Sequence, residues 1–366
     1  MDKSKTIKIK DVLARLNSLA PVALAYQWDN CGLLVGDKES VVQRVFITLD
    51  VTPHAVEMAL ESGAQLILSH HPVIFQPLKN ITNPLLLRLI KNDIAVISMH
   101  TNLDVVPQGV NYALAEALGL HVMEPLSLQT GQSWHHLSVT VPPEYAQAVQ
   151  EAVFAAGGGV IGSYDSCSTV HPIIGSFRSG EDARPFIKGE GLQKVEELEL
   201  EFMIDTAVLN AVLMAIGRAH PYQTPALYHF PVANHNPRYG LGLLCDAPEP
   251  LNMDNLIQRV RQNLHNPAPR LWTAGKDTAT PLKRIAICGG SGGSLLAAAQ
   301  AQADIYISGD FSYHQMLDAT IPLIDAGHYY TEYPVLRYLD AYISGLGLES
   351  VVIPLEAHEF SQFHRQ

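Results

Sequence analysis

The sequence has few charged residues for its length. Only 16% of its 366 residues are charged, whereas an average globular chain has about 25%. The hydrophobic content of 47% excludes an intrinsically disordered chain, because such chains combine low hydrophobicity with high charge. The chain can therefore bury a large core, and its length predicts two or three domains at about 150 residues each.

Positive charge is the scarcer sign. Lys and Arg total 24 against 36 Asp and Glu, which gives a formal net charge of −12. The basic residues are scattered and form no stripe along the sequence. Nucleic-acid binding needs clustered Lys and Arg to displace counterions from the phosphate backbone. The composition therefore argues against a nucleic-acid partner.

Cysteines and long apolar runs are also scarce. The four cysteines contain no CxxC pair, which favours reduced thiols over a disulfide framework or a redox motif. The N-terminal segment 1–21 begins with basic residues but lacks the apolar stretch of a secretory signal. No run of about 18 apolar residues is available to span a membrane. We therefore expect a cytoplasmic protein with no membrane partner.

Strands and helices alternate in the first and last thirds of the chain. Thr52 and Pro53 predict a helix start, with Thr as the N-cap and Pro at the first helical position, and the segment 329–347 predicts one long helix. Apolar, β-branched segments predict strands at 41–50, 66–70, 95–100, 284–290, 304–310, 322–327 and 351–356. This alternation predicts an α/β domain with a mainly parallel or mixed sheet.

The middle of the chain has a different pattern. A strand at 137–142 and a helix at 143–158 precede a Gly/Ser-rich stretch. The segment 194–204 alternates charged and apolar residues, as in a half-exposed antiparallel strand, and a helix capped by Asp205 follows. The order β-α-β-β-α-β predicts a ferredoxin-like α+β domain. We expect the domains to be 1–129 with 239–366, which form a discontinuous α/β domain, and 130–238, which is inserted into it.

The 16 histidines include several at the ends of predicted strands. Each of these strand ends has two residues of types that can bind metals. The three pairs are His70 and His71, His100 and Asp104, and His328 and Glu332. Ligands of open α/β sheets bind beyond the carboxyl ends of the strands. We therefore expect these side chains to meet at one edge of the sheet.

Imidazoles and carboxylates in this pattern predict a metal site. They bind Zn, Fe, Mn, Co and Ni, which the donor set alone does not separate. Six donors with two carboxylates suit two ions about 3.5–4 Å apart, which activate water and stabilise both oxygens in phosphoryl or related transfer. The alternative is structural, since a histidine at a strand end can bond a backbone carbonyl. Three strand ends with a second donor each favour the metal site.

Five motifs occur in a fixed order along the chain: WDNCGLLVG (28–36), SHHP (69–72), HTNLD with PQGVN (100–111), SGDFSYH (308–314) and GHYYTE (327–332). This combination resembles the Nif-three-like family, whose members are often named GTP cyclohydrolase I type 2 homologues. The middle segment resembles the PII/CutA-like insert of the longer members, and HPYQTPALYHFPV (220–232) resembles the end of that insert.

The resemblance implies a dinuclear site with two divalent metal ions. His100 matches a position beside that site and is a candidate ligand or supporting residue, and Glu332 is the expected bridging ligand. The resemblance also implies a toroidal homohexamer with its sites facing an inner cavity. The implied ligands are His70, His71, Asp104, His328 and Glu332.

Two further segments are candidates for the same site. Asp310 and His314 follow another predicted strand end, as candidate acid–base groups or supports for the ligands. The loop GGSGG (289–293) joins a strand to a helix and is a candidate phosphate contact, with a tight packing turn as the alternative. Its candidate residues are Gly289, Gly290, Ser291 and Gly292.

Three interpretations of the function follow. The first is a metal-dependent hydrolase, of cyclohydrolase or phosphoesterase type, acting on a small anionic, nucleotide-like molecule. Two divalent ions would bring about four positive charges to an otherwise acidic protein. The alternative is a non-enzymatic metal-binding protein whose insert binds an effector or partner. A metal chaperone or store is a third, weaker interpretation.

Overall fold

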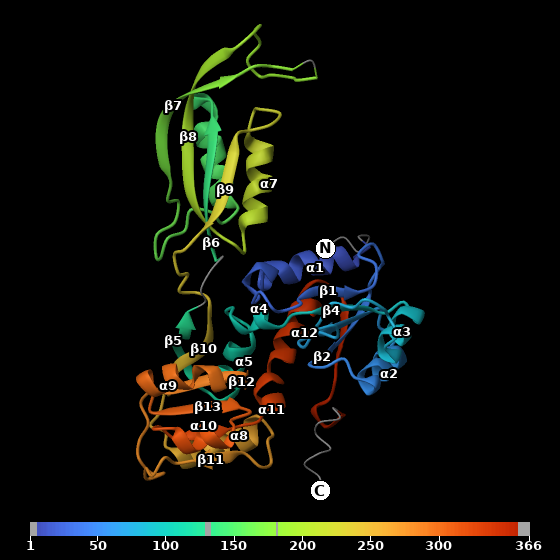
Figure 1. Ribbon diagram of the computed structural model, residues 1–366, viewed down its shortest axis with the longest axis vertical. Coiled ribbons are helices and arrows are strands. Elements are labelled where there is room, and N and C mark those ends of the chain that lie inside the picture. Colours follow the sequence, from blue (N-terminus) through green and yellow to red (C-terminus); the bar gives the residue numbers. More distant parts are fainter. Residues whose placement is uncertain (1–5, 129–132, 181, 358–366) are drawn as a thin grey trace. The chain divides into compact units, whose positions relative to one another are not determined.

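The computed structural model describes residues 6–128, 133–180 and 182–357 (Figure 1). The chain divides into two compact units, Met1–Gln129 with Pro237–Gln366, and Thr130–Asn236. The larger unit is therefore discontinuous in sequence. Over the described ranges, no helix combines the length and apolar character needed to cross a membrane.

The described part of the larger unit contains two mixed sheets. The first has the strand order β1-β4-β3-β2-β15. Its strands β2, β3, β4 and β15 run parallel, and β1 is antiparallel at one edge. β3 and β4 are buried throughout, as expected of parallel strands covered on both faces. The strands are β1 (Gly32–Val35), β2 (Arg44–Thr48), β3 (Leu66–Ser69), β4 (Ala95–Ser98) and β15 (Glu349–Val352).

The second sheet has the order β11-β14-β13-β12-β10-β5. Here β12, β13 and β14 are parallel, whereas β5, β10 and β11 are added in antiparallel orientation. The expected mixed α/β fold is confirmed, but as two sheets. The strands are β5 (His121–Leu128), β10 (Gly240–Asp246), β11 (Arg270–Trp272), β12 (Ile285–Ser291), β13 (Ile305–Gly309) and β14 (Leu323–Asp325).

Local capping signals position the helices of this unit. Ala55 N donates to Thr52 Oγ1 over 3.1 Å at the start of α2 (Pro53–Glu61), as predicted. The prediction of one long helix over 329–347 is wrong. The segment forms α11 (His328–Glu332) and α12 (Val335–Gly345), because Pro334 lacks the N–H that a continuous helix needs.

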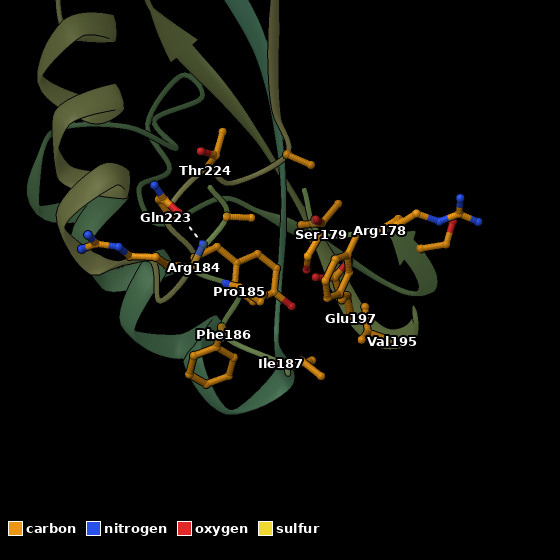
Figure 2. A pocket seen from close by; sticks show the side chains of 16 residues that line it. Arg178, Ser179, Arg184, Pro185, Phe186, Ile187, Val195, Glu197, Gln223 and Thr224 are labelled. Carbon is orange, nitrogen blue, oxygen red and sulfur yellow. Dashed lines mark hydrogen bonds between the residues drawn. The ribbon is translucent and has the colours of Figure 1, made fainter. Parts of the chain in front are cut away.

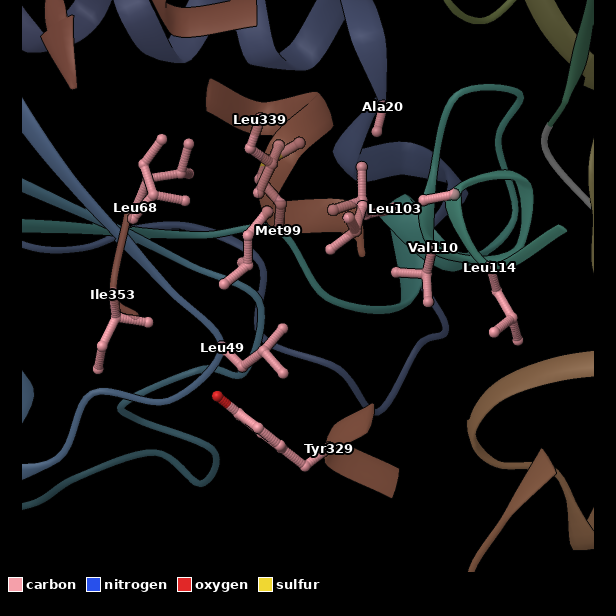
Figure 3. Packing of buried hydrophobic residues seen from close by; sticks show 14 of the residues in the cluster. Ala20, Leu49, Leu68, Met99, Leu103, Val110, Leu114, Tyr329, Leu339 and Ile353 are labelled. Atoms are coloured by element: carbon pink, nitrogen blue, oxygen red, sulfur yellow. The ribbon is translucent and has the colours of Figure 1, made fainter. Parts of the chain in front are cut away.

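The remaining helices of the larger unit are α1 (Ile9–Leu19), α3 (Pro84–Lys91), α4 (Thr101–Asp104), α5 (Val110–Ala117), α8 (Met253–Asn263), α9 (Leu296–Gln302) and α10 (Tyr313–Asp318). One hydrophobic cluster includes residues of both sheets. Helix α5 contacts β10 and β12 of one sheet, and α12 contacts α5 together with β2 and β15 of the other. Figure 3 shows Leu103, Val110 and Tyr329 within this cluster. A shared core thus joins the two sheets.

The inserted unit has the chain order β6-α6-β7-β8-α7-β9 and the sheet order β7-β8-β6-β9, with every pairing antiparallel. The prediction that Asp205 caps the second helix of this unit is wrong. Asp205 accepts from Ala207 N over 2.9 Å, and α7 begins only at Leu209. The elements are β6 (Trp134–Val141), α6 (Ala146–Ala155), β7 (Thr169–Phe177), β8 (Gln193–Asp205), α7 (Leu209–Ala219) and β9 (Leu227–Val232).

Candidate metal centre

The histidines singled out in the sequence come from two sheets. His70 and His71 follow β3 and His100 follows β4, all in the first sheet, whereas His328 and Glu332 begin and end α11 beyond β14 of the second. The expectation of a single sheet edge is therefore wrong. The side chains still converge, because the shared core brings the carboxyl ends of both sets of parallel strands together.

Glu332 lies at the centre of the cluster and is only 4% exposed. Its Oε1 is 3.6 Å from His70 Nε2 and 3.1 Å from His328 Nε2. Its Oε2 is 3.1 Å from His71 Nε2. Asp104 Oδ1 also lies 3.6 Å from His70 Nε2. Three imidazoles thus direct the same ring nitrogen toward one carboxylate.

The opposite nitrogen of each imidazole is held by a second group. His70 Nδ1 bonds the carbonyl oxygen of Met99 over 2.8 Å. His71 Nδ1 bonds Asp50 Oδ1 over 2.8 Å, and His328 Nδ1 bonds Asp310 Oδ2 over 2.7 Å. When Nδ1–H donates in this way, the tautomer and ring orientation are fixed and Nε2 keeps its lone pair. The arrangement is typical of histidines that ligate metals.

His100 occupies a place beside the pair His70-His71. Its ring centroid is 5.4 Å from that of His70 and 5.6 Å from that of His71. Its Nδ1 bonds Asp29 Oδ1 over 2.8 Å, and Asp29 Oδ2 accepts from Thr101 N over 3.0 Å. Burial raises the pKa of Asp29, but hydrogen bonds from His100 and Thr101 outweigh burial and hold it well below its usual range. Asp29 is therefore an anion that orients His100.

The charges of the cluster are strongly coupled. Burial raises the pKa of Glu332, but the surrounding imidazoles outweigh burial and hold it well below its usual range. Burial lowers the pKa of His71, yet Asp50 and Glu332 raise it to about 11. Burial also lowers the pKa of His328, but Asp310 and Glu332 outweigh burial and raise it to about 10. The carboxylates thus draw positive charge into the cluster, either as protons or as metal cations.

Two atoms at the centre are unsatisfied. Among the residues that the structure describes, His70 Nε2 and Glu332 Oε2 are buried without a hydrogen-bond partner, since the approach of His71 to this oxygen lacks hydrogen-bond geometry. An unsatisfied buried polar atom costs about 1–3 kcal/mol. His70, His71 and Glu332 each offer a ligand atom, and these atoms lie within 4.8 Å of one another. The residues present therefore fit a metal ion.

The glycine loop predicted to hold phosphate instead supports Glu332. A Cβ on Gly290, whose φ is +66°, would overlap Glu332 Oε1, so glycine is required there. The amide groups of Gly289 and Gly290 donate to Asn111 Oδ1 and Thr331 Oγ1, both over 2.9 Å. These two amides are therefore not available to a phosphate, which corrects the expectation for them. For Ser291 and Gly292 the phosphate contact stays a prediction.

Asp310 and His314, the two candidate acid–base or supporting residues, lie in different surroundings. Asp310 contacts the cluster through His328, while its predicted acid–base role is not tested. His314 lies on α10, is exposed and packs against Tyr313 at a ring distance of 5.3 Å, so the structure does not bring it into the cluster.

Sequence reasoning missed Asp50, which holds His71 through Nδ1. It lies just beyond the end of β2, and the strand-end rule that selected the histidines would have found it.

Known proteins resemble this chain in sequence and fold. The family model Duf34/NIF3 (NGG1p interacting factor 3) matches residues 7–359. A Halalkalibacterium halodurans protein named GTP cyclohydrolase 1 type 2 homolog is 35% identical over 319 residues, 84% of this chain and 85% of that protein. A Staphylococcus aureus protein of the same name is 32% identical over 361 residues, 96% and 97% of the two chains. The structure of a Bacillus cereus protein related to NIF3 superimposes with a TM-score of 0.80 at 31% identity, covering 97% of this chain and 98% of that one. The chain belongs to the Duf34/NIF3 family.

Proposed function

We propose that the cluster around Glu332 binds two divalent metal ions and that the protein is a metal-dependent hydrolase of a small, nucleotide-like substrate. One observation carries the proposal. Three imidazoles, each fixed through Nδ1, present Nε2 to a single buried carboxylate that retains an unpartnered oxygen. A purely structural histidine cluster has no need of such an oxygen.

The spacing of the donor atoms supports metal binding. The nitrogen-to-oxygen separations in the cluster run from 3.1 Å to 3.6 Å. Two ligand atoms about 2.1 Å from one tetrahedral ion are about 3.4 Å apart. The residues that would hold the ions are His70, His71, Asp104, His328 and Glu332. Glu332 directs one carboxylate oxygen toward His70 and His328 and the other toward His71.

The surrounding residues would prepare the site for hydrolysis. A bound divalent ion supplies an activated water and positive charge for an anionic substrate. Asp50 and Asp310 hold two of the imidazoles in place. His100 is held by Asp29 through Nδ1, so its Nε2 is the atom that either ligates or carries a proton.

The test compares metal content and turnover in the same preparations. The wild type is loaded with Zn²⁺, Mn²⁺ or Fe²⁺ and assayed for opening of the guanine ring of GTP and for phosphate release from nucleotides. His71→Ala and Glu332→Ala should lose both metal and activity. His314→Ala, an exposed histidine outside the cluster, is the matched control and should keep both. Activity that is equal in all four proteins would contradict the hydrolase.

The second candidate is a non-enzymatic metal-binding protein with a regulatory insert. It is favoured by the inserted unit, whose chain order and β7-β8-β6-β9 sheet lead us to infer a ferredoxin-like, PII/CutA-like domain. This candidate predicts that effector binding requires the insert and persists after chelation of the metal.

We also infer a cytoplasmic homohexamer from the family resemblance. Sedimentation of the full chain would test the number of subunits.

A further inference from the structure

A pocket in the inserted unit contains buried polar atoms that bond to nothing in the described structure. Its volume is about 280 Å³, and side chains from β8 and from the segments 176–179, 183–187 and 222–226 line it (Figure 2). Glu197 Oε1 and Ser179 Oγ are buried there without a hydrogen-bond partner among the described residues. An unpartnered carboxylate oxygen in such a place is costly for folding.

The chain is built to keep Glu197 in this position. The residue lies in β8 with only 7% of its surface exposed. Its register partner on the neighbouring strand β7 is Ile173, and a Cβ on Gly175, two residues further along β7, would overlap Glu197 Oε2. Glycine at 175 therefore leaves the space that the carboxylate occupies. Glu196, the adjacent residue in β8, is exposed on the other face.

The segment that begins at His220 forms one wall of the pocket. His220 Nε2 donates to the carbonyl oxygen of Thr140 over 2.8 Å, and its Nδ1 accepts from Tyr222 N over 3.0 Å. Burial lowers the pKa of His220, so the ring stays neutral in this role. Gln223 Oε1 accepts from Arg184 N over 3.0 Å, which ties the segment 183–187 to this wall (Figure 2).

Aromatic rings lie beside the carboxylate. The ring centroid of Phe186 is 5.6 Å from that of Tyr145 and 5.9 Å from that of Tyr222. Tyr222 and Glu197 line the same pocket, and Tyr222 Oη is also buried without a hydrogen-bond partner among the described residues. Burial, and then the interaction with Glu197, raise the pKa of Tyr222, so its hydroxyl stays protonated. Arg178 and Arg184 also line the pocket, but their guanidinium groups point away from Glu197 (Figure 2). The aromatic faces and the buried carboxylate are therefore the groups that suit a positively charged ligand.

We propose that this pocket binds a small organic cation, an ammonium or amidinium group on an apolar body, with the cation paired to Glu197. The ligand would satisfy Glu197 Oε1 and place its apolar part against Phe186 and Tyr222. The volume of about 280 Å³ is at the lower end of ligand pockets, so a body of about one ring fits. This site is independent of the metal cluster and of the proposed hydrolysis.

The binding experiment uses the full chain and probes of nearly equal shape. Benzylamine and benzamidine are the cations, benzyl alcohol is the neutral control and benzoate is the anionic control, each titrated by calorimetry. The cations should bind saturably and the controls about tenfold more weakly or not at all. Glu197→Gln should weaken cation binding about tenfold, whereas Glu196→Gln, the same charge change on the exposed face, should not. Absence of saturable cation binding, equal binding by Glu197→Gln, or preference for benzoate would each overturn the proposal.

A melting experiment separates ligand binding from a structural role. Removing an unpartnered buried charge should raise the Tm of the ligand-free protein, so Glu197→Gln is expected to melt higher than the wild type. Benzamidine should then raise the Tm of the wild type and of Glu196→Gln but leave that of Glu197→Gln unchanged. A lower Tm for ligand-free Glu197→Gln would show that the carboxylate stabilises the fold itself and would overturn the proposal.

Discussion

Two buried carboxylates, Glu332 in the larger unit and Glu197 in the insert, have opposite surroundings. Glu332 faces three imidazoles whose orientations are fixed by further groups. Glu197 shares its pocket with aromatic rings, hydroxyl groups and the side chains of Arg178 and Arg184, and its Oε1 has no hydrogen-bond partner among the described residues. Both, however, lie against a glycine that leaves them room, Gly290 and Gly175. We thus propose that the same residue type meets an inorganic cation in one unit and an organic cation in the other.

The largest expected effect follows from exchanging Glu332 for its neutral analogue. Glu332→Gln removes the shared ligand and leaves the imidazoles without their buried counter-charge, a loss of about 3–5 kcal/mol in the metal-free protein. Added Zn²⁺ or Mn²⁺ should raise the Tm of the wild type by several degrees and that of the variant not at all. Glu197→Gln is the matched control and should respond to metal like the wild type. A full metal response in Glu332→Gln would contradict the role of this carboxylate as a metal ligand.

The two glycines give the next largest effect. Gly290→Ala places a Cβ onto Glu332 Oε1 at a positive φ, which costs about 1–3 kcal/mol of stability and should weaken metal binding. Gly175→Ala displaces Glu197 and should weaken benzamidine binding while metal affinity stays unchanged. Both affinities are measured by calorimetry on both variants. Loss of metal binding in Gly175→Ala would show that the two sites are not separate.

A smaller effect is expected from the residue that orients His71. Asp50→Asn keeps the size of the side chain but weakens the bond to His71 Nδ1. Loss of such a partner typically reduces metal affinity about 10- to 100-fold without removing a ligand. Competition with a fluorescent chelator measures the change. Glu57→Gln, an exposed acid in α2 of the same unit, is the control, and an affinity in Asp50→Asn equal to that of the control would contradict the orienting role.

The affinity of the cluster for metal should depend on pH. Without metal, burial lowers the pKa of His71, but Asp50 and Glu332 outweigh burial and raise it to about 11, so protons compete with the metal ion for this imidazole. Metal binding must release protons, and apparent affinity should rise as the pH increases from 5 to 9. Calorimetry in two buffers of different ionisation enthalpy counts the released protons. An affinity that is independent of pH would exclude ligation by histidine.

The sequence predicted the metal candidates better than their setting. Strand-end histidines with carboxylates in reach were enough to select His70, His71, His328 and Glu332, because strand ends are local features. The antiparallel strands β5 and β10 carry no comparable local signal, so the division into two sheets was missed. The break between α11 and α12, by contrast, has a local signal, because Pro334 has no N–H to donate within a helix.

The pocket of the insert was beyond sequence reasoning. A glutamate in a strand of alternating charges looks solvent-exposed, and nothing local distinguishes Glu197 from Glu196. Only the pairing of β8 with β7, which sets Gly175 beside it, and the segment 183–187 bury this carboxylate. Long-range packing of this kind is not encoded in residue spacing.

The most direct test of the central claim is elemental analysis of the wild type and Glu332→Gln, purified side by side and exposed to the same divalent metal before dialysis. The account predicts about two tightly held ions per chain in the wild type and a loss of both in Glu332→Gln. Equal metal content in the two proteins, or none in either, would contradict it.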